Sequence, residues 1–245
     1  MAKRGEKRHL KRITAPKTIP VKNKKGNVWM ARGMAGAHQK RFAIPLVILM
    51  REVLEVCRTA KEVTRVLHER AVQVDGRVRT DPRYSVGLMD VISFPKIKKY
   101  YRILINSKGK LNAVEIDEKE AGNKIGKVTA KYTVKKGQIM IRLHDGKNLK
   151  ADKNVKRGDS VVVSIADNKI KELLKLQNGA RCLVKDGKHA GAIATLEKIG
   201  VQREGGKIEA HLKSEKEEFI TILDHLFVID DSIKGVKQWV IQCKK

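Results

Sequence analysis

The stretch between residues 58 and 92 constrains the fold most, because it combines a capped amphipathic helix with a tight turn. Thr59 is a favourable N-cap residue, and the Glu62 side chain, three residues later, can accept a hydrogen bond from the N–H of that cap. Four apolar residues recur at helical spacing: Ala60, Val63, Val66 and Leu67. Three basic residues fall on the opposite side: Lys61, Arg65 and His68. The sequence therefore predicts a helix over 59–70 with one buried face and one positively charged face.

A β-hairpin is expected directly after this helix. Val72 and Val74 alternate with polar residues, Asp75-Gly76 supplies the turn, and Val78 lies on the return strand. A two-residue loop would place Val74 opposite a charged residue, whereas one extra residue at the turn would place it opposite Val78. We therefore expect a bulge near the glycine, and a further strand over 86–92.

The composition favours a polyanionic partner. The 245-residue chain has 54 Lys and Arg against 27 Asp and Glu, which gives a net charge of +27. Such an excess is typical of proteins that bind nucleic acid. An anionic membrane surface usually requires a basic amphipathic helix or a lipid anchor, and no run approaches the roughly 18 apolar residues of a membrane span. We expect no membrane partner and no secretory signal.

The first 43 residues carry much of this charge. They contain 13 Lys and Arg against one acid, Glu6, while Pro16, Pro20 and Gly26 interrupt any helix. Such a segment cannot bury enough apolar surface to fold alone. It is expected either to remain a solvated tail or to become ordered on RNA phosphates, and the basic helix that follows favours the second alternative. Trp29 can stack on a base or sugar, or can pin the segment to the protein.

A buried helix is expected over 44–57, where the residues are apolar almost all round and Pro45 stands near the first position. Cys57 fits this core better than it fits any chemistry. Cys57, Cys182 and Cys243 are far apart, and the seven histidines are scattered. The sequence therefore predicts no disulfide framework, no metal site and no cofactor, in a reducing compartment.

Short strand-like runs dominate between residues 100 and 171. They occupy 101–105, 111–116, 128–134, 139–143 and 161–165, with glycine turns between them. This pattern is typical of a small closed or partly open barrel. Residues 96–171 contain 20 Lys and Arg against 8 acids, an imbalance that favours RNA contact beyond the protection of strand edges.

Residues 178–199 read as two strands around a glycine-bearing loop. The first strand, 181–184, enters a turn at Asp186-Gly187, and Gly191 releases the chain into a second strand over 192–199. An ordinary hairpin would show the same glycine spacing. Residues 172–245 are nearly neutral, with 13 basic and 11 acidic residues, so fewer phosphate contacts are expected here. The runs 219–223 and 226–229 are expected to close this unit.

Two of these segments resemble known RNA-binding modules. The capped helix, the V-x-V-D-G-x-V hairpin from Val72, the Pro82 turn and the strand from Val86 resemble the S4 RNA-binding domain. Many such domains have Gly-Asp in the last strand, where this chain has Gly87-Leu88-Met89-Asp90. The strand–loop–strand over 181–199 resembles the KOW motif of SH3-like barrels, whose loop contacts RNA or ribosomal proteins in many members.

Catalytic motifs do not accompany these modules in the sequence. Five glycine–lysine pairs occur, but none is followed by Ser or Thr, so a phosphate-binding P-loop is excluded. There is no G-x-G-x-x-G after a strand, no H-E-x-x-H and no G-x-S-x-G. S4 domains also occur on RNA-modifying enzymes, but the small strand-rich units leave no room for a catalytic domain. We expect no enzyme and no small-molecule substrate.

The order of the segments resembles the archaeal and eukaryotic small-subunit ribosomal protein family S4e over nearly the whole chain. The carrying segments are HLKRITAPK from His9, VDGRVRTD from Val74, MDVIS from Met89, LHDGKN from Leu143 and the glycine-rich loop near Gly187. With its end at Lys245, the chain resembles the archaeal form more than the longer eukaryotic form, and we expect an archaeal-type protein. The resemblance implies a cytoplasmic constituent of the small ribosomal subunit that binds small-subunit ribosomal RNA beside neighbouring ribosomal proteins. The alternative is a free factor that docks on the ribosome or on a polymerase.

The expected fold class is α+β with several domains. These are a basic N-terminal extension (1–42), an S4-like RNA-binding domain (43–105), a central β-rich and barrel-like domain (106–172), and a C-terminal SH3-like barrel with the KOW motif (173–245). Binding would rest on charge and shape, because double-helical RNA presents phosphates and 2′-hydroxyls rather than readable base edges. The candidate RNA-binding residues are Lys3, Arg4, Lys7, Arg8, Lys11, Arg12, Lys17, Lys22, Lys24, Lys25, Trp29, Arg32, His38, Lys40, Arg41, Arg58, Lys61, Arg65, Arg77, Arg79, Lys185, Lys188 and His189.

Overall fold

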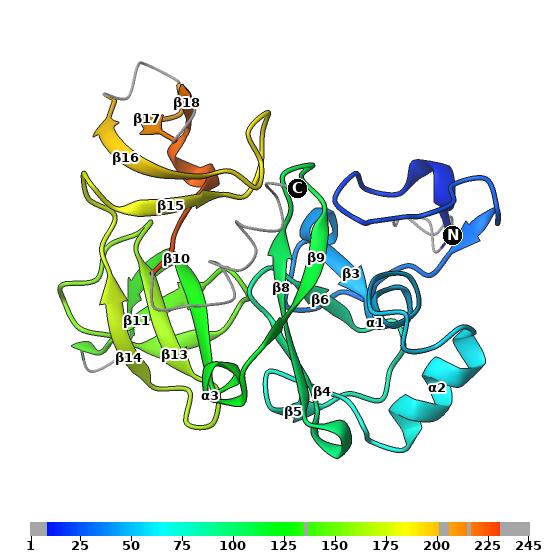
Figure 1. The fold of residues 1–245 in the computed structure, drawn as a ribbon. Coiled ribbons are helices and arrows are strands. Elements are labelled where there is room, and N and C mark those ends of the chain that lie inside the picture. The colour runs from blue at the N-terminus through cyan, green and yellow to red at the C-terminus, as the bar shows by residue number, and fades with distance from the viewer. Residues whose placement is uncertain (1–8, 135–136, 201–205, 215–216, 231–245) are drawn as a thin grey trace, which may run out of the picture.

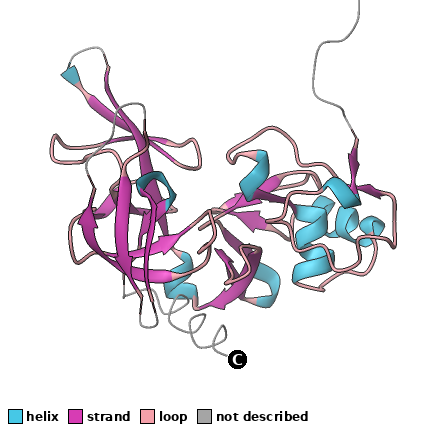
Figure 2. Ribbon diagram, turned by 90° about the horizontal axis from the view of Figure 1, so that it is seen from above, coloured by secondary structure: helices cyan, strands magenta, loops and turns pink. Residues whose placement is uncertain are grey.

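Three five-stranded antiparallel sheets make up most of the structure, a computed structural model that describes residues 9–134, 137–200, 206–214 and 217–230. The longer helices gather on one side of the molecule, beside the first sheet (Figures 1 and 2). Within the described ranges, no helix has the length and apolarity needed to cross a bilayer.

The first sheet has the order β5-β4-β7-β8-β9 and packs against the helices. Its strands are β4 (Gln73–Val74), β5 (Arg77–Val78), β7 (Val91–Phe94), β8 (Lys99–Ile105) and β9 (Leu111–Ile116). The helical elements are α1 (Leu46–Ile48), the π-helical turn η3 (Leu49–Val53), α2 (Ala60–His68) and the 3-10 turn η4 (Pro95–Ile97). Strand β9 pairs with β8 along its whole length, so this sheet continues across the expected domain boundary between residues 105 and 106.

The helix expected over 44–57 is shorter than its apolar pattern suggested. Residues Ala43–Pro45 form strand β3, which pairs with β6 (Ser85–Gly87), and helical backbone occupies only Leu46–Val53. A residue before proline is disfavoured in the α region, so Ile44 is extended and Pro45 becomes the N-cap. Cys57 is buried, as expected.

The hairpin of β4 and β5 closes with a two-residue turn, so the expected bulge at Gly76 is wrong. Val74 pairs with Arg77, and Asp75 and Gly76 both have positive φ, 49° and 72°, as a tight type I′ turn requires. Strand β7 lies on the other side of β4 and helps to bury Val74, while Val78 stays 42% exposed. Because β7 and the core supply the apolar neighbours, Val74 needs no apolar partner on β5.

The strand expected over 86–92 is two strands. β6 ends at Gly87 and β7 begins at Val91. Between them Met89 has a φ of 66°, which breaks the extended run, while its side chain is fully buried. The spacing that departs from the usual S4 pattern therefore marks a change of direction between two strands.

The described part of the N-terminal segment folds back onto the first sheet and its helices. It contains β1 (Leu10–Lys11), the 3-10 turns η1 (Arg12–Thr14) and η2 (Lys40–Phe42), and β2 (Trp29–Met30). Ile19, Val21 and Met30 are buried in the same core cluster as α1 and α2, and the Leu111 N–H donates to the Thr18 carbonyl at 2.8 Å. The segment is ordered by its own protein, which corrects the expectation of a tail whose order depends on RNA.

The central sheet has the order β12-β11-β10-β13-β14 and its own apolar core. Its elements are α3 (Glu118–Ala121), β10 (Asn123–Thr133), β11 (Ile139–Leu143), β12 (Asn148–Lys150), β13 (Ser160–Ser164) and β14 (Ile170–Leu174). Strand β10 is long enough to pair with β13 through its first half and with β11 through its second half. One strand thereby joins the two parts of this sheet.

The third sheet has the order β18-β17-β16-β15-β19 and lies above the central sheet in Figure 1. Its elements are β15 (Arg181–Val184), β16 (Ile193–Ile199), β17 (Glu209–Lys213), β18 (Glu218–Ile222), the 3-10 turn η6 (Leu223–His225) and β19 (Leu226–Val228). Leu183, Phe227 and Ile229 pack into the large core of the first sheet. The third sheet is therefore attached to the rest of the molecule by apolar contacts.

Candidate nucleic-acid interface

Helix α2 begins with the expected capping box. The Glu62 N–H donates to Thr59 Oγ1 at 3.2 Å, and Glu62 Oε2 accepts from the N–H groups of Thr59 and Arg58 at 3.3 and 2.8 Å. The Arg58 N–H, followed by the Thr59 groups, holds the pKa of the Glu62 carboxyl below its ordinary value. The carboxylate also lies where a helix favours negative charge. These contacts fix the orientation of α2 from its first turn.

The two faces of α2 differ as the sequence predicts. Val63 and Leu67 are fully buried, while Lys61, Arg65 and His68 are exposed. Ala60, which the spacing placed on the apolar face, is exposed. Because α2 rests on the core through only part of its circumference, its basic side faces solvent.

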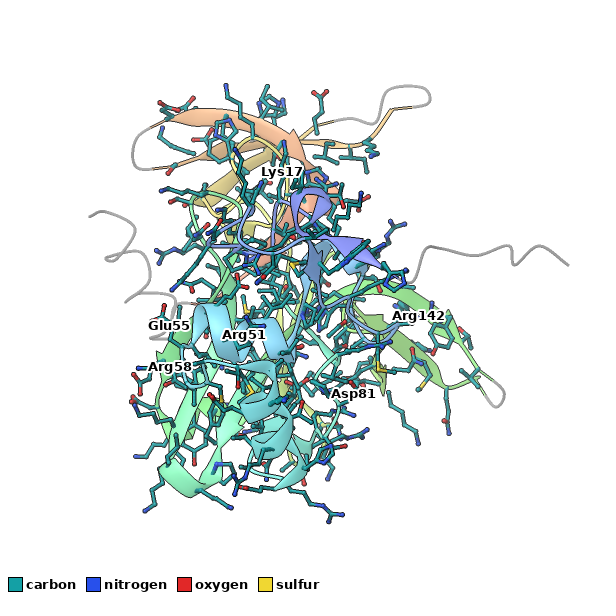
Figure 3. All side chains as sticks on the ribbon, turned by 90° about the vertical axis from the view of Figure 1, so that its right-hand side faces the viewer. Lys17, Arg51, Glu55, Arg58, Asp81 and Arg142 are labelled. Carbon is teal, nitrogen blue, oxygen red and sulfur yellow. The ribbon has the colours of Figure 1, made fainter. Side chains whose placement is uncertain are left out.

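The positive face of α2 continues toward the preceding turn. Arg58 is exposed, and Arg65 is 85% exposed with a loose ion pair to Glu69 at 3.4 Å, a contact that contributes little at such exposure. Figure 3 shows Arg51 and Arg58 on the part of the molecule formed by the helices, with Lys17 above them on the N-terminal segment. Arg51 was not among the sequence candidates, because it stands within an apolar run.

The hairpin contributes two further arginines. Arg77 is exposed at the tip. The guanidinium of Arg79 lies 4.2 Å from the centre of the Tyr84 ring, a cation–π arrangement that holds its side chain in place. Both line a cavity of about 270 Å³, together with Tyr84 and Lys147. Asp75, Asp90 and Asp145 line the same cavity, so the opening between the hairpin and the turn before β12 carries charges of both signs.

The candidates in the N-terminal segment divide by exposure. Lys11, Lys17, Lys22, Lys24, Lys25, Trp29, Lys40 and Arg41 are exposed, and Arg32 is half-buried. Lys22 pairs with Glu55, and Arg41 pairs with Asp186 at 2.9 Å. Lys3, Arg4, Lys7 and Arg8 lie outside the described residues.

Two of the candidates point inward. Arg12 is 7% exposed and donates to Glu52 Oε1 at 2.7 Å. His38 is 8% exposed, and its Nε2 lies 2.8 Å from Asp90 Oδ2. Both side chains join the N-terminal segment to the rest of the protein, so we leave them out of the RNA-facing set.

A buried lysine holds three carboxylates where the first and central sheets meet. Lys124 Nζ, on β10, lies 2.5 Å from Asp90, 2.6 Å from Asp75 and 2.8 Å from Asp145. Burial opposes charge on Lys124, but the carboxylates hold its pKa above the ordinary value. Burial likewise opposes charge on Asp90, but Lys124 and His38 hold its pKa below the ordinary value. This cluster fixes the position of the hairpin on the central sheet through charge-assisted hydrogen bonds. Its members are far apart in the sequence, so no local sequence pattern could predict it.

His144 lies beside this cluster as a neutral ring. Its Nδ1 accepts from the Lys127 N–H at 3.2 Å, and its Nε2 then donates to the Leu88 carbonyl at 3.0 Å. Burial, followed by the charge of Lys124, lowers the pKa of His144 to about 4. The centres of the His144 and Phe227 rings lie 5.2 Å apart in an edge-on arrangement. His144 therefore links the central sheet to the third sheet and to the β6–β7 turn.

The loop between β15 and β16 lies against the β8–β9 turn and against Phe42 of the N-terminal segment. Gly191 stands so close to the Asn106 carbonyl that a Cβ would overlap it. Lys185 is half-buried, 5.9 Å from the centre of the Phe42 ring, and burial lowers its pKa. His189 stacks on the Phe219 ring at 4.2 Å. The third candidate in the loop, Lys188, is exposed. Much of the loop surface is therefore used within the molecule.

The described residues include side chains that can serve as metal ligands. No group of three or more His, Cys, Asp or Glu side chains among them is arranged to hold a metal ion. The acidic cluster described above is occupied by the Lys124 ammonium.

Three family models match successive segments of the chain. Residues 4–41 match the RS4NT (NUC023) domain, residues 45–92 match the S4 domain, and residues 97–170 match the ribosomal family S4e. The match to the S4 domain covers α1, α2 and the hairpin, and the match to the family S4e covers β8 and most of the central sheet.

Relatives from archaea and insects are similar over almost the whole chain. The small ribosomal subunit protein eS4 of Methanosphaera stadtmanae is 36% identical over 229 residues, which cover 94% of this chain and 95% of the relative. The eS4 protein of Spodoptera frugiperda is 35% identical over 240 residues, which cover 97% of this chain and 89% of the relative. The crystal structure of the 30S ribosomal protein S4e from Thermoplasma acidophilum is 32% identical, with a TM-score of 0.67 over 78% of this chain and 96% of that one. With identities above 30% over nearly its full length, this chain belongs to the ribosomal family S4e.

Proposed function

We propose that this protein is a structural constituent of the small ribosomal subunit and that it binds small-subunit ribosomal RNA. The observation that carries the proposal is the set of solvent-accessible cations on α2 and on the β4–β5 hairpin, in a chain whose relatives are named as small-subunit ribosomal proteins. A net charge of +27 gives the protein a favourable field for RNA.

The RNA-binding role is assigned to side chains that reach solvent. On α2 and the preceding turn these are Arg58, Lys61 and Arg65, and on the hairpin they are Arg77 and Arg79. The N-terminal segment adds Lys11, Lys17, Lys22, Lys24, Lys25, Arg32, Lys40 and Arg41, and the proposal extends to Lys3, Arg4, Lys7 and Arg8. Each cation that neutralises a phosphate releases counterions, and this release drives binding.

Buried polar contacts join segments that carry these cations. Lys124 holds the β4–β5 turn against the central sheet through Asp75, and His38 holds the N-terminal segment against Asp90. The backbone segments that carry the cations are therefore held together before RNA arrives. Such an arrangement suits double-helical RNA, which proteins recognise mainly by shape and by phosphate and 2′-hydroxyl contacts.

The third sheet is assigned the KOW-like role and contact with neighbouring ribosomal proteins. We infer an SH3-like barrel here, in which the β15–β16 loop offers Lys188 outward while Lys185 and His189 support the loop from within. The work of the protein is binding and positioning in the cytoplasm, and catalysis has no part in the proposal.

Sedimentation of a cell lysate through a sucrose gradient tests the proposal. The chain is expected to migrate with the small subunit and to remain there after a moderate salt wash. Release by mild salt into a large free pool would contradict it and would favour a transient translation or transcription factor.

A further inference from the structure

The ribbon formed by β1 and β2 holds Trp29 away from the core. Leu10 pairs with Met30, and Lys11 pairs with Trp29. Side chains alternate between the two faces of a strand, and Leu10 and Met30 pack against the core cluster. Lys11 and Trp29 therefore share the outward face, where Trp29 is 57% exposed.

Two more apolar side chains are exposed at the same end of the ribbon. The Arg12 N–H donates to the Val28 carbonyl at 3.0 Å, so the backbones of these residues are adjacent. Val28 is 64% exposed and Ile13, next to Arg12, is 71% exposed. Three large apolar side chains exposed within one short stretch of the fold indicate a contact surface more than a solvated loop.

The residues around this end of the β1–β2 ribbon are basic, which indicates the chemistry of its partner. Residues 9–42 contain no Asp or Glu. Lys11 lies across the ribbon from Trp29, the His9 ring is 5.4 Å from the indole, and Lys24 and Lys25 are exposed on a turn held by Asn23 Oδ1. A half-exposed aromatic ring among cations fits a nucleobase flanked by phosphates.

We propose that Trp29 stacks on an unpaired nucleotide of the bound RNA while Lys11 neutralises an adjacent phosphate. The inference rests on the proposed function and names one element of RNA structure, a base outside the double helix. A single ring is enough for one base, so a chain with only 4% aromatic residues can make this contact.

Tryptophan fluorescence tests the stacking directly. The chain has two tryptophans, so the full-length Trp239→Phe variant reports Trp29 alone. Transcribed small-subunit ribosomal RNA is expected to quench this emission, whereas heparin, a polyanion without bases, is expected to leave it nearly unchanged. Equal quenching by both would overturn the stacking. Protection of the indole from acrylamide in assembled subunits, without quenching by the RNA, would identify a protein partner and would also overturn it.

Binding measurements separate this inference from the proposed function. Trp29→Ala is expected to weaken RNA binding on the order of tenfold, with an unchanged slope of log K against log salt, because no cation is removed. Trp29→Phe should recover most of the affinity, and Ile220→Ala, which changes an equally exposed apolar side chain on β18, should have no effect. Wild-type binding with a steep salt slope but no loss in Trp29→Ala would overturn the stacking alone. Absence of salt-dependent binding by the wild type would overturn the proposed function.

Discussion

His38 Nε2 lies 2.8 Å from Asp90 Oδ2 in the interior, although the two residues are 52 positions apart in the chain. The other oxygen of the same carboxylate lies 2.5 Å from Lys124 Nζ. Asp90 therefore joins the N-terminal segment, the first sheet and the central sheet at one point. Because all three side chains are buried, these parts cannot move independently without exposing or separating charges.

Removal of the central lysine should destabilise the fold strongly. Lys124→Met leaves Asp75, Asp90 and Asp145 buried without their cation, and breaking a buried ion pair from one side typically costs about 3–5 kcal/mol. Urea denaturation measures the change in unfolding free energy. Lys119→Met, on the exposed side of α3, is the control and should change stability by less than about 0.5 kcal/mol. A loss no larger than that of the control would mean that the cluster does not hold the sheets together.

The stability of the fold should fall as the pH is lowered from about 6.5 to 4. His144 is buried and neutral with a pKa of about 4, whereas an unfolded histidine has a pKa of about 6.5. As the pH falls, the unfolded state binds the proton before the folded state does. The stability that the neutral His144 contributes is therefore fully present above pH 6.5 and is lost as the pH falls toward 4, by up to about 3 kcal/mol. His144→Gln should flatten this part of the pH profile, and His68→Gln, on the exposed face of α2, should not. An unchanged profile in His144→Gln would assign the acid sensitivity to other groups.

The basic face of α2 should carry part of the salt dependence of RNA binding. Changing Lys61 and Arg65 together to Gln is expected to weaken binding and to reduce the salt slope by up to about two phosphate contacts. A filter-binding titration at several salt concentrations measures both quantities. The control changes Lys175 and Lys198 to Gln, which are exposed lysines of the C-terminal part. Equal slopes for the two double variants would remove α2 from the RNA-binding surface.

The N-terminal segment should prove to be part of the folded core. Ile19 is 5% exposed, so Ile19→Ala is expected to cost about 2–4 kcal/mol through lost burial and a cavity. Ile13→Ala provides a matched comparison in the same segment, because Ile13 is 71% exposed and its loss should be within about 0.5 kcal/mol. Deletion of residues 1–41 should accordingly lower the thermal midpoint as well as the RNA affinity. If the truncated chain had the same thermal midpoint as the full chain, the N-terminal segment would be an independent tail after all.

The β15–β16 loop should be sensitive to a single methyl group. Gly191 and Gly179 both have a φ of 86°, so alanine introduces the same backbone strain at each, about 1–2 kcal/mol. Only at Gly191 does the new Cβ overlap the Asn106 carbonyl, and the space around Gly179 is open. Gly191→Ala should therefore be clearly less stable than Gly179→Ala in thermal unfolding. Similar midpoints would mean that the loop is not pressed against the β8–β9 turn.

Features that depend on neighbouring residues could be predicted from the sequence. The capping box of Thr59 and Glu62 is confirmed, and β9 and β11 have the expected bounds. Caps and turns are satisfied by hydrogen bonds within a few residues, so their sequence patterns are sufficient. The prediction of a bulge is wrong because it depended on a distant part of the chain. Strand β7, and not the hairpin partner, sets the environment of Val74.

The composition determined that this protein would attract a polyanion, and local patterns determined the helix and the hairpin that present the charge. Only the tertiary structure decided which cations remain outside. Arg12 and His38 have the same local context as their exposed neighbours, yet Glu52 and Asp90 draw them into the interior. Lys124 likewise reads as one basic residue among many, until three distant carboxylates converge on it. Burial of a charge depends on partners that folding brings together from far along the chain, and no short stretch of sequence contains that information.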